Sequence, residues 1–434
     1  MSTFFIIIAF IILLGVFSAW PEIGLYLVAF CLPVIGLNFY LKGLDFPLVD
    51  LLSLILFASF IIRYVLQILF KKQEERAKII LKWPLFFPFF LFLLISLVSS
   101  LFSSQISYSL YYWLRWPIFL YFTYIFLPYN IIKDTKILKR TIIAMVFGSF
   151  IVLLSGFLSL YGQDWRDSFF RLKSISLFGV YLFGENQNLI AEYLNVGVFL
   201  VLVLKFFVKK SRGKRFLDLV FIIMALGLVL TFSKSGWITF FIQLTIYIWY
   251  YLRARNHSPL KIIAIFFGIL IISSPLLFKM NQLQKNNASS TENRWLLTEI
   301  AVQAFYDKPY FGYGDGQFIN LVDNNLRFKT KYGAALDSHG MFQKVLAENG
   351  LFGLAAWLFI LFYFLKVAYQ SLKLYQDRNP WLLPLFLAAG GALFFQIFNT
   401  SYYKGKVWLP VTLCLVAISL LEKYYARKSS GTNK

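Results

Sequence analysis

The sequence predicts an all-α membrane protein: a polytopic bundle of about 12–13 transmembrane helices with one large extracytoplasmic loop that contains an amphipathic helix. Of its 434 residues, 59% are apolar or aromatic and only 14% are charged. Soluble domains are typically about 45–50% apolar and about 25% charged, so a soluble enzyme, a disordered chain and a disulfide scaffold are excluded. The apolar segments also lack the alternation of apolar and polar residues that barrel strands require.

Apolar stretches long enough to cross a bilayer recur along the whole chain. The predicted spans are 4–19, 23–41, 46–69, 85–102, 112–128, 141–160, 189–208, 216–232, 236–252, 262–278, 350–368, 381–398 and 407–421. The first stretch is expected to be a span, because it lacks the basic n-region and the cleavage site of a signal peptide. Pro33 interrupts the second stretch, so the first two spans are the least regular of the set.

The net charge of +22 predicts the orientation of these spans, because Lys and Arg concentrate in cytoplasmic loops. The basic clusters that follow the third, fifth, seventh, ninth and eleventh spans are Lys71, Lys72, Arg76, Lys78, Lys82, Lys133, Lys136, Lys139, Arg140, Lys209, Lys210, Arg212, Lys214, Arg215, Arg253, Arg255, Lys261, Lys373 and Arg378. The loops 103–111, 161–188, 233–235, 279–349 and 399–406 carry less positive charge and are predicted to be extracytoplasmic. Thirteen spans place the N-terminus outside, whereas an even number places both ends inside. The basic loops are expected to meet anionic lipid headgroups, so no nucleic-acid partner is inferred.

The segment 279–349 is too long for a simple connection and is expected to be functional. Apolar residues between Trp295 and Phe305 recur at helical spacing, and Ser289 with Glu292 resembles a capping box, so a helix should begin near residue 290. The predicted domains are therefore a transmembrane bundle (1–278), an extracytoplasmic loop with catalytic residues (279–349), and C-terminal helices with a basic tail (350–434).

Cysteine and histidine are too scarce for a metal centre or a disulfide framework. Cys31 and Cys414 lie in apolar stretches and match no metal-ligand or redox spacing. His257 lies among basic residues of a predicted cytoplasmic loop and suggests no chemistry. We therefore expect neither a metal nor a cofactor.

Two residues of the long loop could take part in catalysis. His339 is the only histidine on the predicted outer side, and Ser338 or Asp337 could cap the helix that follows it. The positive end of that helix would keep the imidazole neutral, as a general base requires. Arg294, early in the predicted amphipathic helix, could bind phosphate through two parallel hydrogen bonds. The structural alternatives are a hydrogen-bonded loop histidine and a solvated arginine.

Two further cations lie at the predicted outer ends of spans. Lys234 occupies a very short turn and could hold a phosphate, or it could extend to the lipid headgroups. Arg115 lies near the outer end of the fifth span and could bind substrate or reach the interface. The segment Gly312-Tyr313-Gly314-Asp315-Gly316 lacks the residues of a phosphate-binding loop, so a tight turn with positive φ is expected there.

Taken as an ordered set, four stretches resemble the O-antigen ligase and O-antigen polymerase superfamily of bacterial membrane glycosyltransferases. The stretch 184–194, which contains Asn188, resembles the beginning of a central span in that family. The turn 231–237 resembles its Ser-Arg-Gly turn, with Lys234 in place of the usual arginine. The stretches 293–318 and 338–350 resemble the start of its large outer loop and its His-Asn turn, with Gly340 in place of the asparagine. Residues before 170 match only as generic spans.

The resemblance implies transfer of a glycan from undecaprenyl diphosphate to an acceptor hydroxyl on the outer face of the bacterial cytoplasmic (inner) membrane, without a nucleotide sugar or a required metal. Arg294 and Lys234 would bind the diphosphate, His339 would take the acceptor proton, and Asn188 and Arg115 are possible substrate-binding residues. The acceptor would be another lipid-linked glycan in a polymerase, which is slightly favoured because polymerases are numerous and diverse, or lipid A–core in a ligase.

Two other classes of protein remain open at this stage. A transporter of lipid-linked glycans is disfavoured, because no internal repeat is evident and few ionisable residues lie at mid-span depth. A non-catalytic scaffold would explain the outer loop, but not the ordered catalytic pattern.

Overall fold

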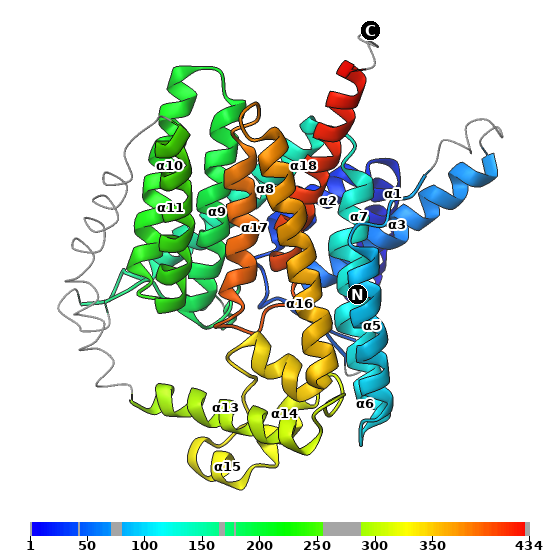
Figure 1. The fold of residues 1–434 in the computed structure, drawn as a ribbon, viewed down its shortest axis with the longest axis vertical. Helices are drawn as coiled ribbons and strands as arrows, with labels where there is room; N and C mark the ends of the chain where they lie inside the picture. Colours follow the sequence, from blue (N-terminus) through cyan, green and yellow to red (C-terminus); the bar gives the residue numbers. More distant parts are fainter. Residues whose placement is uncertain are drawn as a thin grey trace.

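The computed structural model describes residues 2–41, 44–70, 80–164, 170–177, 179–254 and 288–429, and helices dominate it (Figure 1). The α-helices are α1 (Ser2–Ala19), α2 (Pro21–Cys31), α3 (Leu48–Phe70), α5 (Phe86–Leu101), α6 (Ile106–Trp113), α7 (Leu127–Ile131), α8 (Thr135–Leu158), α9 (Gln187–Phe207), α10 (Ser211–Leu230), α11 (Lys234–Ala254), α13 (Ala288–Asp307), α14 (Phe318–Asp323), α15 (Leu326–Tyr332), α16 (Met341–Tyr375), α17 (Leu382–Phe395) and α18 (Gly405–Ser429). A single antiparallel pair, β1 (Asn38–Leu41) and β2 (Leu44–Pro47), makes up the described sheet.

The prediction of an all-α, polytopic membrane protein is confirmed. By length and composition, five described helices could cross a membrane, namely α3, α8, α9, α16 and α18, and the bent pair α1–α2 could form a sixth span. The apolar helices α5 and α17 are shorter. The predicted span 262–278 and His257 lie outside the described residues.

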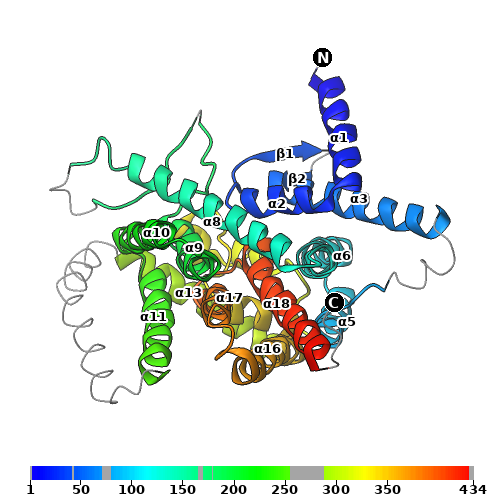
Figure 2. The same cartoon turned by 90° about the horizontal axis from the view of Figure 1, so that it is seen from above.

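Helix α9 lies at the centre of the bundle and packs against α8, α10, α11 and α17 (Figure 2). Its apolar side chains are buried over almost its whole length, which explains why its sequence shows no polar face. Polar side chains join α11 to its neighbours: Gln243 Nε2 donates to Leu387 O of α17 at 2.7 Å, and Asn195 Nδ2 of α9 donates to Gly236 O at 3.2 Å. Such hydrogen bonds hold transmembrane helices together where water is excluded.

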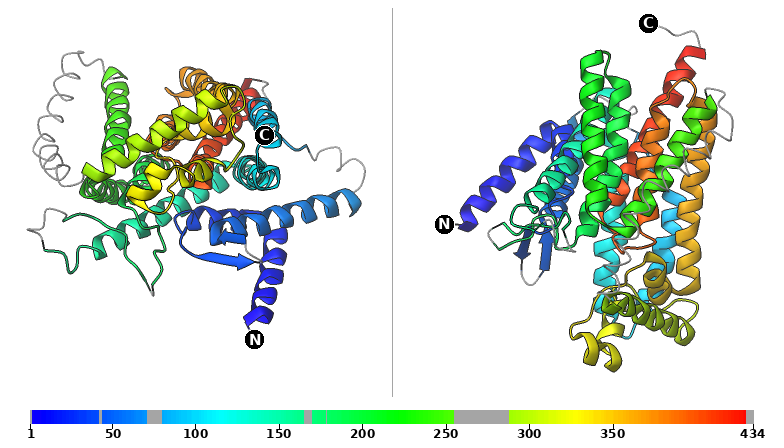
Figure 3. Two further views of the ribbon diagram at one scale, coloured as in Figure 1. Left: turned by 90° about the horizontal axis from the view of Figure 1, so that it is seen from below. Right: turned by 90° about the vertical axis from the view of Figure 1, so that its left-hand side faces the viewer.

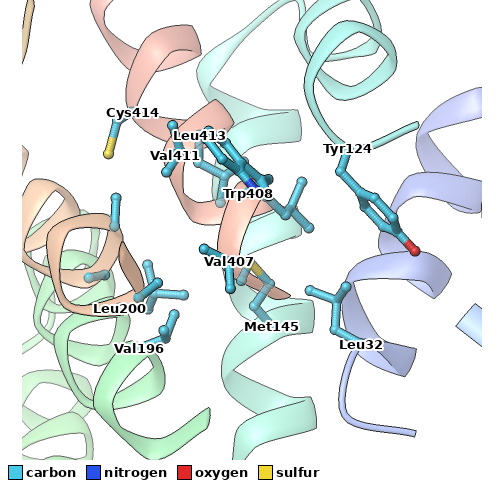
Figure 4. Packing of buried hydrophobic residues seen from close by; sticks show 14 of the residues in the cluster. Leu32, Tyr124, Met145, Val196, Leu200, Val407, Trp408, Val411, Leu413 and Cys414 are labelled. Carbon is cyan, nitrogen blue, oxygen red and sulfur yellow. The ribbon is translucent and has the colours of Figure 1, made fainter. Parts of the chain in front are cut away.

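The main core surrounds the first half of α18. Trp408 is 1% exposed and lies with Val407 and Val411 among residues of α2, α8 and α9 (Figure 4). The rings of Phe89 and Trp357 also meet the indole of Trp408 edge-on, at centroid distances of 4.9 and 5.5 Å. This core fixes the beginning of α18, and with it the segment that precedes it.

The N-terminal region differs from the prediction. Instead of a span over 23–41, helix α2 ends at Cys31 and meets the last part of α1 at an angle of 119°. Pro33 lies directly after the last helical backbone angles, those of Leu32 (φ −48°, ψ −38°), and it has no backbone N–H with which to continue the helical hydrogen bonds. The chain then forms β1 and β2 and only afterwards enters α3.

The predicted span 112–128 consists of several short helical pieces. Two π-helical segments, η1 (Leu114–Ile118) and η2 (Tyr121–Phe126), lie between α6 and α7. Pro117 lies inside η1, where its missing N–H prevents regular α-helical hydrogen bonding. This irregularity changes the direction in which Arg115 and Trp116 project.

The connections gather at two opposite ends of the bundle (Figures 1 and 3). The connection from α9 to α10, the turn from α16 to α17 and the end of α18 lie at one end (top of Figure 1). The turn from α10 to α11, the segment between α17 and α18, and helices α13 to α15 lie at the other. The alternation of basic loops in the sequence predicts this same grouping.

Helix α13 confirms the predicted helix near residue 290 and lies across one end of the bundle (Figure 3, left). It buries Leu297 and Ile300 in a small separate core with Phe318 and Phe328, whereas Trp295, predicted on the apolar face, is 72% exposed. The side chain of Ser289 and the residues before Ala288 lie outside the described part of the chain, and so does the predicted capping box.

Candidate functional site

The turn between α10 and α11 joins Lys234 to the beginning of α9. Ser233 Oγ donates to Asn188 Oδ1 at 2.7 Å and also accepts a hydrogen bond from Gly236 N at 3.2 Å. Asn186 caps α9 by accepting from Asn188 N at 2.9 Å, so the side chain of Asn188 projects from a fixed first turn. The structure therefore brings Asn188 next to the turn that exposes Lys234.

Arg294 projects from α13 near the same turn. Its positive charge acts on two other groups: it contributes to lowering the pKa of Lys234 and that of His339. Partial desolvation is the larger cause in both cases. Helix α13 is tied to the beginning of α16, because Gln343 Nε2 donates to Thr298 Oγ1 at 2.7 Å. Three segments that are distant in sequence thus place Lys234, Arg294 and His339 in one neighbourhood.

His339 lies half-buried in a turn held from both sides. Thr400 Oγ1 donates to Ser338 O at 2.8 Å, and Met341 N donates to Gln396 O at 3.0 Å. The N-cap of α16 is Gly340, so the expectation that Ser338 or Asp337 caps this helix is wrong. Ser338 instead bonds within the turn, where its Oγ donates to Gly340 O and accepts from Gly340 N.

Gly340 permits a close approach between this turn and the segment after α17. A Cβ atom at this position would lie 3.0 Å from Ile397 O and 2.9 Å from Gln343 Oε1. A larger residue would push the two segments apart and disturb the hydrogen bonds that fix His339. Close packing therefore explains why Gly340 stands where the resembled family has asparagine.

The protonation of His339 suits a proton acceptor. Burial and the charge of Arg294 lower the pKa of His339, and these causes outweigh the opposite effect of Asp337. The imidazole is therefore neutral at pH 7, and a neutral imidazole can accept a proton from a hydroxyl group.

Sequence reasoning missed a buried ionic network directly behind His339. Lys344, whose side chain is 2% exposed, donates to both oxygens of Asp337 at 2.8 Å and lies 3.9 Å from Glu348. Asp315 accepts a hydrogen bond from Asn349 Nδ2 at 2.9 Å. The segment 279–349 carries charges of both signs, but a sequence does not reveal which of them become buried. The network was therefore not predictable from the single residues.

The glycine-rich segment near Asp315 has the predicted tight-turn geometry. Gly312, Gly314 and Gly316 have φ values of 68°, 102° and 77°. The turn places Asp315 against α5, where it also accepts hydrogen bonds from Ser96 and Ser100. Burial raises the pKa of Asp315 to about 6, although these hydrogen bonds oppose the shift.

A second buried ion pair supports the other side of the His339 turn. Lys406 lies 2.5 Å from Glu192, whose two carboxylate oxygens also accept hydrogen bonds from Gln396 at 2.9 Å and Asn399 at 3.0 Å. The same segment supplies the backbone contacts to residues 338–341. Glu192 thus anchors the segment between α17 and α18, which holds the turn of His339.

Arg115 lies on another side of this arrangement. Its guanidinium donates a hydrogen bond to Tyr111 OH at 3.3 Å and lies 6.0 Å from the ring centre of Phe46, and its charge acts on Lys404.

Within the residues that the structure describes, no three histidine, cysteine, aspartate or glutamate side chains are arranged to hold a metal ion.

Comparison with known proteins finds relatives for the part of the chain that contains this site. Residues 219–358 match the family described as O-antigen ligase. The ComP-specific O-oligosaccharyltransferase of Acinetobacter baylyi is 29% identical over 190 residues, which cover 40% of this chain and 34% of that protein. The chain thus spans about a third of the length of this curated relative. Lys234, Arg294 and His339 all lie inside the matched family region, whereas Asn188 and Arg115 precede it.

Proposed function

From the match of residues 219–358 to the O-antigen ligase family, we propose that this multi-pass membrane protein is a glycosyltransferase that moves a glycan from undecaprenyl diphosphate to an acceptor hydroxyl. We place the reaction on the outer face of the bacterial cytoplasmic membrane. The segment 279–349 would hold most of the catalytic residues, between the bundle of residues 1–278 and the helices of residues 350–434. The observation that carries the proposal is that the charge of Arg294 acts on both Lys234 and His339, while α13 is tied to the beginning of α16 by the hydrogen bond from Gln343 to Thr298.

The cations fit a diphosphate leaving group. As the bond between the anomeric carbon and the diphosphate oxygen breaks, negative charge grows on the diphosphate. Lys234 would stabilise it as a point charge and Arg294 through paired hydrogen bonds. Burial and the charge of Arg294 lower the pKa of Lys234, and an anion between these two exposed cations would offset their repulsion.

His339 fits the role of general base. The acceptor oxygen forms the new bond to the anomeric carbon, and the neutral imidazole takes the proton that this oxygen loses. The hydrogen bonds that hold residues 338–341 from both sides would keep the imidazole in place during the reaction. The amide of Asn188, which contacts the turn of Lys234, would orient the donor beside the diphosphate.

The acceptor distinguishes two forms of this function. A polymerase would use a second lipid-linked glycan, which the sequence slightly favours. A ligase would use lipid A–core, and the name of the matching family favours it. The name of the curated relative adds the transfer of oligosaccharide as the relevant chemistry, without fixing the acceptor here.

The test uses purified protein in liposomes with undecaprenyl-diphosphate-linked oligosaccharide. Longer lipid-linked glycans identify a polymerase, and glycan on added lipid A–core identifies a ligase. Replacing His339→Ala should lower the rate by a factor of about 10²–10⁴, the usual contribution of a general base. Lys209→Gln, an exposed residue at the opposite end of the bundle, is the control. Movement of the lipid between leaflets without a new glycosidic bond would identify a transporter and contradict the proposal.

A further inference from the structure

An ion pair between Lys344 and Asp337 spans the turn that contains His339. Asp337 lies before the turn and Lys344 near the beginning of α16, and Lys344 Nζ donates to both carboxylate oxygens of Asp337 at 2.8 Å. One of these oxygens also accepts a hydrogen bond from Ser338 N at 2.9 Å. The ion pair therefore links α16 to the backbone directly before His339.

The ammonium group of Lys344 is enclosed by aromatic rings and carboxylates. Its Nζ lies 4.6 Å from the ring centre of Trp116 and 5.3 Å from that of Tyr403, and these two rings stack on each other. Glu348 Oε1 is 3.9 Å away and accepts a hydrogen bond from Phe318 N at 3.1 Å. A buried ammonium group requires such partners, so the position of Lys344, which is 2% exposed, is fixed by them.

The pairing with Lys344 also changes how Asp337 acts on His339. One residue separates the two, so their Cα atoms lie at most about 7 Å apart. Burial and the charge of Arg294 lower the pKa of His339, whereas the negative charge of Asp337 acts to raise it. Lys344 is bound to the same carboxylate and offsets part of that negative charge. It thus favours the neutral imidazole.

Other charged groups lie on the elements around this turn. Those on the described elements include Arg294 of α13, Asp315 of the glycine-rich segment, Glu348 of α16, Glu192 of α9, Lys404 directly before α18 and Lys406 within it. Lys406 and Glu192 pair with each other at 2.5 Å. All of these groups stay in place when Lys344 or Asp337 is replaced, so a change in the titration of His339 then reports the charge that was removed.

We propose that Lys344 is a positioning residue for His339: it holds the Asp337 carboxylate against the backbone of the turn and offsets its negative charge. The carboxylate can then fix the turn without stabilising the protonated imidazole, which could not accept a proton. This inference rests on the proposed function, in which His339 is the general base. A purely structural ion pair would stabilise the same turn but would leave the titration of His339 unchanged.

The first test measures the titration of His339 directly and requires no substrate. In His257→Gln, His339 is the single histidine of the chain, so NMR of the detergent-solubilised protein with carbon-13-labelled histidine reports one imidazole. In this background, Lys344→Met should move the midpoint of the titration to higher pH by at least about 0.4 pH units, the effect of one elementary charge about 7 Å away in water. Asp337→Asn should move the midpoint to lower pH, because Lys344 then acts alone.

Matched variants separate this effect from damage to the fold. Asp337→Asn/Lys344→Met removes both charges, so His339 should titrate close to the wild-type midpoint. Lys329→Met removes an exposed cation that lies 3.6 Å from Asp323, and it should leave the midpoint unchanged. Where Lys344→Met does not fold, Lys344→Gln removes the same charge and can keep one hydrogen bond to the carboxylate. An unshifted midpoint in the Lys344 variant, or shifts of both single variants in the same direction, would overturn the proposal.

The second test asks whether the fixed turn is needed for transfer. In Asp337→Asn/Lys344→Met the imidazole stays neutral but its backbone is less well held, so kcat should fall at least tenfold while the KM for the lipid-linked donor stays unchanged. In Lys344→Met the acid limb of kcat/KM should also move to higher pH. An unchanged kcat in the double variant refutes the positioning role. A wild type that transfers no glycan contradicts the proposed function, whereas the NMR titration still decides whether Lys344 acts on His339.

Discussion

At the scale of single residues, His339 depends on neighbours that act through charge and through backbone contacts. Arg294 lowers its pKa, and the backbone of residues 338–341 is fixed by Thr400 and Gln396. The imidazole is therefore neutral, and the backbone that carries it is held in place. Each property can be tested by changing a neighbour while leaving the imidazole itself intact.

The charge of Arg294 should set the acid limit of activity. A protonated imidazole cannot accept the acceptor proton, so the rate should fall as the pH drops through the pKa of His339. Burial and Arg294 hold the pKa of His339 below its ordinary value of about 6.5, so more than half of the wild-type imidazole should be neutral at pH 6.5. In Arg294→Gln the pKa of His339 rises, and the acid limb of kcat/KM should move to higher pH.

Arg294→Lys is the control for this experiment, because it keeps the charge and loses the paired hydrogen bonds. It should lower the rate while leaving the position of the acid limb in place. An acid limb that stays unchanged in Arg294→Gln would mean that this charge does not act on the catalytic base.

The Glu192–Lys406 pair should contribute strongly to stability. Lys406→Met leaves the carboxylate of Glu192, which is 2% exposed, without its cation, and breaking a buried ion pair in this way costs about 3–5 kcal/mol. Glu192→Gln/Lys406→Met should cost less, because no buried charge is left unpaired. Thermal unfolding in detergent measures both, and equal losses in the two variants would contradict this account.

At the scale of elements, Gly350 divides α16 into a short segment behind His339 and a long apolar segment. Its φ of 64° interrupts the helical geometry, and a Cβ there would lie 2.5 Å from the backbone of Tyr310. Leu351 N and Phe352 N donate to Pro309 O and Tyr310 O. These hydrogen bonds at the kink join Pro309 and Tyr310 to the long apolar segment of α16.

Gly350→Ala should therefore destabilise the protein by more than the roughly 1–2 kcal/mol that a left-handed alanine costs. Gly390→Ala is the matched control: this glycine lies inside α17, and no atom lies within 4 Å of an added Cβ. It should be neutral or stabilising by up to about 1 kcal/mol. The melting temperatures of the two variants decide the question, and similar values would contradict the role of the kink.

Regular elements were predictable where hydrophobic periodicity alone determines them. The long apolar helices and α13 agree with the prediction, because burial of an apolar face requires no knowledge of distant residues. The early end of α2 and the π-helical turns of residues 114–126 were missed, although Pro33 and Pro117 mark both places. The effect of a proline depends on the neighbours that replace its lost hydrogen bond, and these come from elsewhere in the chain.

At the scale of the whole molecule, the two ends of the bundle should face opposite sides of the membrane. The native cysteines are buried, so an introduced cysteine reports its own surroundings. In intact cells, Thr330→Cys on α15 should react with a membrane-impermeant maleimide, whereas Lys209→Cys should react only after permeabilisation. Equal labelling of both positions, or the reverse order, would contradict the proposed orientation.

The sequence could single out candidate residues but not their arrangement. The ordered set of motifs points to Lys234, Arg294, His339 and Asn188, and their roles stay predictions. The motifs did not identify Lys344, Glu348 or Lys404, because the contacts of these residues follow from helix packing and from charges that are far apart in the sequence. Long-range packing also explains the Trp116–Tyr403 stack, which joins the segment of Arg115 to that of Lys404.

The central claim is that Lys234, Arg294 and His339 act together on one lipid diphosphate. An experimental structure of the protein with undecaprenyl diphosphate bound tests it most directly. We expect the diphosphate between Lys234 Nζ and the guanidinium of Arg294, with the imidazole of His339 facing the phosphate oxygen that carries the glycan in the substrate. A diphosphate bound away from both cations, or an imidazole that faces away from it, would contradict the claim.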